Sequence, residues 1–504
     1  MMLIKCFVLL TAVAHAAPLC PIFPNPASVP AAAVLGSPEV KDALRLVDDL
    51  LKNASTGIPS GLVATVVFDQ STAWTKGYGY KDVKFPSQGP PDEHSLVRIA
   101  SITKVFTSML LYILRDRGHV NLEDNLTKYM PEFSIQSSGK ITLRELASHT
   151  SGLPRETPYP CSSFEYPGCN ESEVLESLST KAAVSPVHRR FHYSNLGMAL
   201  LGRALGHVGE NFSYEDLVEK YITRPMMMTN ATFAYNQTTM ERSAKGTDKE
   251  GKEVKVPVGP SCGFGAPAGC LWASAGDIGA LMKLLFRADS TKKDDPLGGS
   301  TISEMLAPEI LLRNGFEAVG TPFEMQYVSN RYWTKGKQGE LPGYRSSMTI
   351  LDDLRLGVFT SALVSDVDED SVWTIPALEI LAPAFEAALN RLQPSPQLPK
   401  NYQLLEGSYY DGSVTIEANG QKLVLKTSKD GPRLQLKTDP TIPPDFLRAH
   451  DIDGLSTLGC RWKDDGTDQE LVQFIMGNGA DRKADEVVAI EFMGARYNRR
   501  WDAN

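Results

Sequence analysis

Runs of basic residues are absent from this 504-residue sequence, whose 51 Lys and Arg against 60 Asp and Glu give a formal net charge of -9. Nucleic acids and anionic membranes bind strongly positive surfaces, so we expect neither as a partner. No segment past the N-terminus is apolar enough to span a bilayer, so stable membrane insertion is not expected. The histidines show no H-E-x-x-H or similar ligand spacing, and we expect no metal and no cofactor.

The N-terminus has the pattern of a secretory signal peptide. Lys5 supplies a short basic region, residues 6–13 form an apolar core far shorter than a membrane span, and Ala14-His15-Ala16 is a small-residue cleavage site. We therefore expect residues 1–16 to be removed, the mature chain to begin near Ala17 and the protein to be secreted.

Cysteine is scarce, and one of the seven, Cys6, falls in the signal peptide. An even number of cysteines in an exported chain suggests disulfides, and several connectivities are open. Two pairs of cysteines are close in the sequence, which favours a disulfide within each, and the two remaining cysteines would form the third. The alternative is free buried thiols. The expected pairs are Cys161 with Cys169, Cys262 with Cys270, and Cys20 with Cys460.

Sequons of the form N-x-S/T point to the same compartment. An occupied sequon means a eukaryotic secretory pathway and a surface position for its asparagine. The candidate glycosylation sites are Asn53, Asn125, Asn170, Asn211, Asn230 and Asn236.

The order of apolar patterns predicts an α+β fold, and the length predicts two globular units. After an Ala/Pro-rich arm at 17–36, Ser37 as N-cap and Pro38 at the first helical position begin a helix. Strands near 61–68 and 73–79 precede mostly helical sequence at 101–286, then strands near 331–334, 346–351 and 354–361 and a helix near 375–392. Residues 37–392 should thus form an antiparallel sheet flanked by helices, beside an all-helical region.

Beyond this unit, residues 393–400 are typical of a stiff, proline-rich linker. Short alternating strands broken by Gly and Asp fill residues 401–504. They predict a small C-terminal all-β domain, a barrel or a sandwich. The oligomeric state is not encoded in any of these patterns.

Ser101 and Lys104 begin a long apolar helix and are the most informative residues of the chain. Residues three apart share a helix face, so the ammonium should lie beside the hydroxyl. A serine hydroxyl becomes a useful nucleophile when a neighbouring base or cation activates it, and burial can push a lysine toward its neutral form. The spacing predicts an acyl-transfer enzyme.

Two further motifs lie far downstream, Tyr193-Ser194-Asn195 and Lys337-Gln338-Gly339. Together with Ser101-x-x-Lys104 they resemble the motif set of the serine β-lactamase and penicillin-binding-protein superfamily. The chain is most similar to the class C and esterase-like branch, and the Y-x-N form of the second motif resembles that of the class C and carboxypeptidase branches. Residues 141–154, 191–202 and 269–277 also resemble segments of that family. The resemblance covers about residues 40 to 390 and implies a β-lactamase-like fold.

The resemblance implies a catalytic role for three residues. Ser101 would be the nucleophile that forms the acyl-enzyme, and Lys104 would stabilise its alkoxide and help move the proton. Tyr193 would act as general base and then as general acid, with its phenol pKa lowered by Lys104 and Lys337. The alternatives are a helix-capping serine beside a surface lysine, and a buried structural tyrosine.

Four further residues would bind the substrate. Asn195 would hydrogen-bond the acyl side chain and Lys104, against a plain Asx turn. Lys337 would stand on an edge strand and supply positive potential to the cleft, although the nearby Lys335 competes for this assignment. The main-chain N–H groups of Ser101 and of Glu340, which follows Gly339, would form the oxyanion hole.

One departure from the family bears on the substrate. Penicillin-recognising members carry Thr or Ser where this chain has Gln338, which argues against antibiotic degradation. A rival nucleophile, Ser261 in a G-x-S-x-G sequence, lies between Pro260 and a Gly/Pro-rich stretch, which is unlike the strand-turn-helix that such a motif requires. His149 and His192 fit structural hydrogen bonds beside the cleft.

Three hypotheses follow. The first is a secreted serine hydrolase that cleaves an ester, lactone or amide of a small-molecule or peptide-like acyl substrate through a Ser101 acyl-enzyme. The second is an acyltransferase of the same fold acting on a small natural product, which differs in whether water reaches the acyl-enzyme. The third is a non-catalytic binding relative, against which the intact motifs count.

Overall fold

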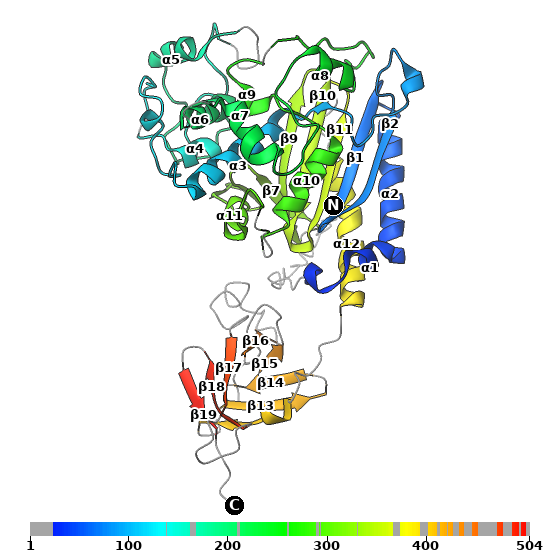
Figure 1. The fold of residues 1–504 in the computed structure, drawn as a ribbon, viewed down its shortest axis with the longest axis vertical. Helices are drawn as coiled ribbons and strands as arrows, with labels where there is room; N and C mark the ends of the chain where they lie inside the picture. The colour runs from blue at the N-terminus through cyan, green and yellow to red at the C-terminus, as the bar shows by residue number, and fades with distance from the viewer. Residues whose placement is uncertain are drawn as a thin grey trace, which may run out of the picture. The chain divides into compact units, whose positions relative to one another are not determined.

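The computed structural model contains two compact units, one formed by Pro24–Leu392 and one that contains Gln393–Asn504 (Figure 1). The expected signal peptide, linker residues 394–400, the Cys20–Cys460 pair, Asn211 and Ser261 lie outside the described residues. The structure describes residues 24–137, 139–161, 168–208, 212–259, 262–288, 292, 294–329, 331–365, 373–393, 402–410, 414–420, 422–426, 433–437, 446–451, 471–476, 486–492 and 495–499.

A nine-stranded antiparallel sheet forms the centre of the described part of Pro24–Leu392, in the order β2-β1-β11-β10-β9-β7-β6-β5, with β8 paired to β7. A separate small sheet pairs β3 (Val97–Arg98) with β4 (Trp272–Ala273). The strands of the large sheet are β1 Gly61–Phe68, β2 Ser71–Gly79, β5 Ile310–Leu311, β6 Glu317–Val319, β7 Glu324–Val328, β8 Tyr332–Trp333, β9 Lys335–Leu341, β10 Tyr344–Leu351 and β11 Leu356–Ala362.

Helices cover both faces of this sheet. Successive residues of a strand point to opposite faces. On β1, Val67 lies against Gly279 of α10 (Ala275–Leu285), whereas the ring of Phe68 lies 5.0 Å from that of Phe385 in α12 (Thr374–Leu392). All eight residues of β1 are therefore buried, which explains its unbroken apolar sequence.

The predicted α+β class, with an antiparallel sheet flanked by helices, is confirmed. Helix α3 (Thr103–Asp116) is buried from Thr103 to Leu114, as expected of a central helix. The remaining helices are α1 Ala31–Gly36, α2 Pro38–Ser55, α4 Leu143–Ala147, α5 Glu171–Ser179, α6 Asn195–Val208, α7 Tyr214–Val218, α8 Gln237–Arg242, α9 Ala266–Gly269 and α11 Gly299–Met305. Short 3₁₀ turns span Pro26–Ser28, Pro86–Gln88, Ala100–Ile102, Leu126–Lys128, Asp352–Leu354 and Tyr402–Leu404, and a π-helical turn spans Glu219–Thr223.

The N-terminal arm, in its described part, is helical. A 3₁₀ turn and α1 occupy it before α2 begins at Pro38 with Ser37 as N-cap, the predicted start. The Ser37 hydroxyl donates to the Val34 carbonyl at 2.7 Å instead of accepting an N–H of α2, so Ser37 joins two helices. None of the described helices is long and apolar enough to cross a membrane.

Apart from the 3₁₀ turn at Tyr402–Leu404, the described part of the C-terminal unit is all-β, as predicted. The eight strands described there follow one another in chain order, each antiparallel to the next, and a bridge between Tyr409 and Arg499 joins the end of the first strand to the end of the last. The sheet thus closes on itself around a small apolar core that includes Ile416, Leu425 and Val472. The strands are β12 Gly407–Tyr409, β13 Val414–Asn419, β14 Lys422–Lys426, β15 Arg433–Lys437, β16 Phe446–Asp451, β17 Leu471–Met476, β18 Val487–Phe492 and β19 Ala495–Asn498.

The structure contains the two short disulfides, Cys161–Cys169 and Cys262–Cys270. It does not give every sequon a surface position. Asn53, Asn170 and Asn236 are exposed and Asn125 is half-buried, but the expectation is wrong for Asn230. That residue is only 9% exposed, because its side-chain oxygen accepts a hydrogen bond from Arg242 and its main-chain N–H donates to the buried Asp277.

Candidate active site

Ser101 lies in the tight 3₁₀ turn that leads into α3, next to strand β9. Ala100 before it has φ of +48°, an unfavourable conformation for a residue with a Cβ. Gly339 permits the close approach of the strand, since a Cβ there would lie 2.6 Å from the Ser101 nitrogen. The turn and the glycine together bring the main chain of β9 beside Ser101, where the oxyanion hole was predicted.

Ser101, Lys104 and Tyr193 form one hydrogen-bonded group. Lys104 Nζ lies 2.9 Å from Ser101 Oγ, and the Tyr193 hydroxyl donates to the same Oγ at 2.7 Å. Tyr193 lies in a loop, two residues before α6 begins at Asn195, so the second motif meets the first as the resemblance implied. The serine oxygen therefore has a phenol on one side and an amine on the other.

The charges around this group shift the pKa values of its members. Burial lowers the pKa of Lys104, and the cation of Lys337 lowers it further, against the opposite effect of Tyr193. Burial would raise the pKa of Tyr193, but the ammonium groups of Lys104 and Lys337 offset this and lower it to about 8. Each ammonium lies 4.9 Å from the centre of the tyrosine ring. A proton can thus move within this group near neutral pH.

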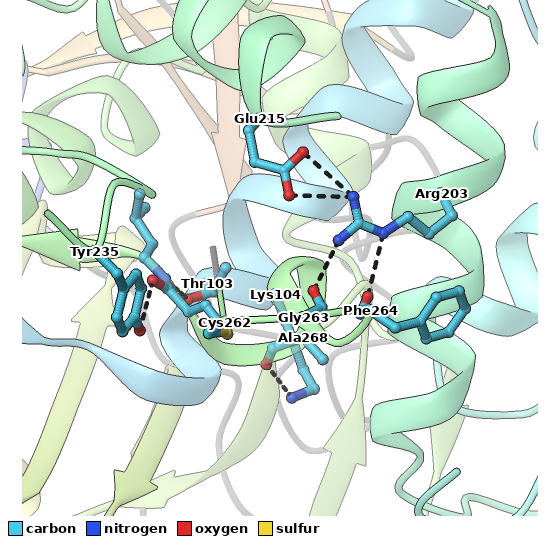
Figure 2. Close-up of a disulfide and its surroundings, with 11 residues drawn as sticks. Thr103, Lys104, Arg203, Glu215, Tyr235, Cys262, Gly263, Phe264 and Ala268 are labelled. Carbon is cyan, nitrogen blue, oxygen red and sulfur yellow. Dashed lines mark hydrogen bonds and ion pairs between the residues drawn. A yellow bond between two sulfur atoms is a disulfide. The ribbon is translucent and has the colours of Figure 1, made fainter. Parts of the chain in front are cut away.

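Lys104 also bonds to a loop closed by a disulfide. Its Nζ donates to the Ala268 carbonyl at 2.6 Å, and Ala268 lies in α9, between Cys262 and Cys270 (Figure 2). The guanidinium of Arg203 holds the same loop through the carbonyls of Gly263, at 3.0 Å, and Phe264, at 3.2 Å. The loop therefore fixes the third partner of the lysine.

Asn195 connects Lys104 to the α6 side of the site. Its side-chain oxygen accepts from Lys104 Nζ at 2.7 Å, and its amide nitrogen donates to Glu156 at 2.6 Å. An Asx turn does not explain these contacts. His149 stacks on the Tyr193 ring at 4.6 Å and accepts the Ser194 N–H at 3.1 Å, which is the structural hydrogen bond expected of it.

The structure distinguishes the two lysines of β9. Lys337 lines the cavity beside Ser101, whereas Lys335 pairs with Asp352. In the sheet order β9 lies between β10 and β7 and is not an edge strand, but its pairing with β7 is confined to Gly336 and Glu324. From Lys337 onward, β9 has no paired strand on that side among the described residues, so the expected edge position holds only there. Lys337 is 2% exposed and contacts Glu324 at 2.6 Å.

A cavity of about 550 Å³ opens over Ser101. Tyr193, Lys337 and Gln338 provide polar lining. An apolar side is formed by Phe191, Leu312, Val319, Met325, Leu341 and Ile375. A cavity of this size and mixed polar and apolar lining is typical of a small-molecule site. Within the described residues no group of three or more His, Cys, Asp and Glu could hold a metal ion.

Comparison with known proteins agrees with this geometry. The model of the family described as Beta-lactamase matches residues 45–372. The chain belongs to this family. Among curated relatives, "Beta-lactamase-like protein 2" of Dictyostelium discoideum is 32% identical over 487 residues, which cover 90% of this chain and 86% of the relative. "D-alanyl-D-alanine-carboxypeptidase/endopeptidase AmpH" of Escherichia coli K12 is 34% identical over a shorter region, 41% of this chain and 53% of that protein.

Solved structures show the same fold at lower identity. A class C beta-lactamase superposes with a TM-score of 0.58 at 18% identity, over 69% of this chain and 98% of that one. An octameric penicillin-binding protein homologue from Pyrococcus abyssi gives a TM-score of 0.57 at 20% identity, over 90% of this chain and 99% of that one. These matches support the β-lactamase-like architecture of this family member.

Three contacts of the site were not predicted from the sequence. Glu156, Ala268 and Glu324 contact Asn195, Lys104 and Lys337 respectively. None of these three residues belongs to one of the recognised sequence motifs. Glu156 lies two residues after the family-like segment that ends at Pro154, and Ala268 directly precedes the one that begins at Gly269, so these positions were the available signals.

Proposed function

We propose that the protein is a secreted serine hydrolase that cleaves an ester, lactone or amide through an acyl-enzyme on Ser101. The observation that carries the proposal is the contact of one serine oxygen with both Tyr193, at 2.7 Å, and Lys104, at 2.9 Å. The two disulfides are compatible with an oxidising compartment and so with secretion.

In the proposed reaction, Tyr193 as phenolate takes the proton of Ser101 while Oγ attacks the substrate carbonyl. The main-chain N–H groups of Ser101 and Glu340 stabilise the oxyanion. As the bond to the leaving group breaks, Tyr193 returns the proton to it. Water then enters, loses a proton to Tyr193 and attacks the acyl carbonyl. As the acid leaves, Tyr193 passes this proton to Ser101 Oγ, which restores the serine hydroxyl and the phenolate.

Lys104 keeps this cycle aligned. As an ammonium it donates all three of its hydrogens, to Ser101, Asn195 and Ala268. Its charge stabilises both the phenolate and the serine alkoxide. Gln338, at the position where penicillin-recognising relatives carry a hydroxyl, favours esters and other simple acyl compounds as substrates over antibiotics.

Labelling with a fluorophosphonate probe, read by intact mass, tests the nucleophile. Wild-type protein should gain one probe adduct, and Ser101→Ala should gain none. Ser261→Ala is the matched control and should label like the wild type. Labelling of the Ser101→Ala protein would refute the assignment.

A further inference from the structure

Lys337 has an internal counter-charge in the cavity. Its ammonium is 2% exposed and lies 2.6 Å from the carboxylate of Glu324, whose side chain is 38% exposed and lines the same cavity. Strands β7, which carries Glu324, and β9, which carries Lys337, hold this pair in place, because Glu324 pairs with Gly336 across them. Glu324 raises the pKa of Lys337 against the effect of burial, so the lysine keeps its positive charge.

The other cations of the cavity also have carboxylate partners. Arg345 lies 3.7 Å from Glu340, and Arg155 lies 3.4 Å from Glu156. Both arginines and Glu340 line the cavity, and so does Glu317, whose carboxylate accepts from Asn314 at 2.6 Å. Negative groups thus at least balance the positive ones around the substrate space.

A carboxylate on a substrate would find Lys337 already paired with Glu324. To bind Lys337 it must displace Glu324 or share the lysine with it, and two like charges in a partly buried site repel each other. A neutral acyl compound has no such cost. Rejection by a built-in like charge is a common origin of specificity.

We propose that Glu324 is a specificity-determining residue that makes the site select neutral acyl donors and reject those that carry a carboxylate. The inference rests on the proposed function and adds the class of substrate to it. The pairing with Lys337 carries this role, and the overall charge of the cavity does not.

Hydrolysis of two esters that differ by one charge tests this role. The probes are methyl 4-acetoxybenzoate, which is neutral, and 4-acetoxybenzoate, its carboxylate. Wild-type enzyme should prefer the neutral ester by about tenfold or more in kcat/KM, the scale of one charge contact in a partly buried site. Glu324→Gln should reduce this preference at least about fivefold. The ratio cancels any effect of the substitution on Tyr193 that both esters share.

Glu317→Gln is the matched control, because it removes the same charge from the same cavity without touching Lys337. Its preference should stay within about twofold of the wild type. An equal change in both variants, or an unchanged ratio in Glu324→Gln, overturns the inference while leaving the hydrolase proposal intact. Failure of the wild type to hydrolyse either ester contradicts the hydrolase proposal and the inference together.

Discussion

The pH dependence of the reaction should be set by Tyr193 and controlled by Lys337. The active form of a general base is deprotonated, so kcat/KM should rise with pH through about 8, the pKa of Tyr193, and then level off. At pH 7 a group with this pKa is about one-tenth ionised, compared with about one-thousandth for an ordinary phenol of pKa near 10. The two lysines thus supply about a hundredfold more phenolate at neutral pH.

Lys337→Met removes one of the cations that lower this pKa and leaves Glu324 without its partner. Both changes disfavour the phenolate, so the rising limb should move up by about one pH unit or more. At pH 7 kcat/KM should fall about tenfold, and at pH 10 it should approach the wild-type value. Because the titrations of Tyr193 and Lys104 are coupled, the apparent pKa read from the rising part of the pH profile describes the two residues together.

The assay is the pH profile of kcat/KM on a neutral aryl ester between pH 6 and 10. Lys335→Met is the control, since this lysine lies on the same strand but pairs with Asp352 outside the cavity. Its profile should match the wild type. Two results would show that the tyrosine is not the titrating base. One is a rise in kcat/KM whose midpoint in Lys337→Met stays within about 0.3 pH unit of the wild-type midpoint. The other is the same rise persisting in Tyr193→Phe.

Two other predictions concern the disulfides and the sequons. Cys262→Ser combined with Cys270→Ser frees the loop that presents Ala268, so kcat should fall, and the chemical denaturation midpoint should decrease by the equivalent of about 2.5 kcal/mol for a loop of this length. Retained kcat with lowered stability would limit the disulfide to a structural role. In protein from a eukaryotic secretory host, Asn53→Gln should lower the intact mass by one glycan and Asn230→Gln should not, because Asn230 is buried; a glycan loss in the latter contradicts this view.

Local patterns predicted the part of the site that lies on one element. Ser101 and Lys104 are three residues apart, so a helix alone places the amine beside the hydroxyl. The disulfide pairs were likewise predicted from short spacing, since a separation of 8 residues joins cysteines of one loop. The meeting of these residues with Tyr193 and Lys337 was inferred only from the resemblance to a family, since no local rule brings them together.

The remaining contacts depend on tertiary packing. Ala268 is 164 residues from Lys104 and acts through its carbonyl, which every residue type has. Glu324 is one of many acidic residues, and its meaning depends on β7 lying beside β9, an order that the sequence did not reveal.

The bridge between Tyr409 and Arg499 affects how the C-terminal unit behaves in a crowded solution. An open sheet offers unpaired N–H and C=O groups along its outer strands, and these groups can recruit a strand from another molecule. Here β12 and β19 are joined at the bridge, and the Tyr410 N–H donates to the Asn498 carbonyl at 2.6 Å beside it. Where they are joined, these strands satisfy each other's backbone groups and resist the edge-to-edge pairing that begins many protein aggregates.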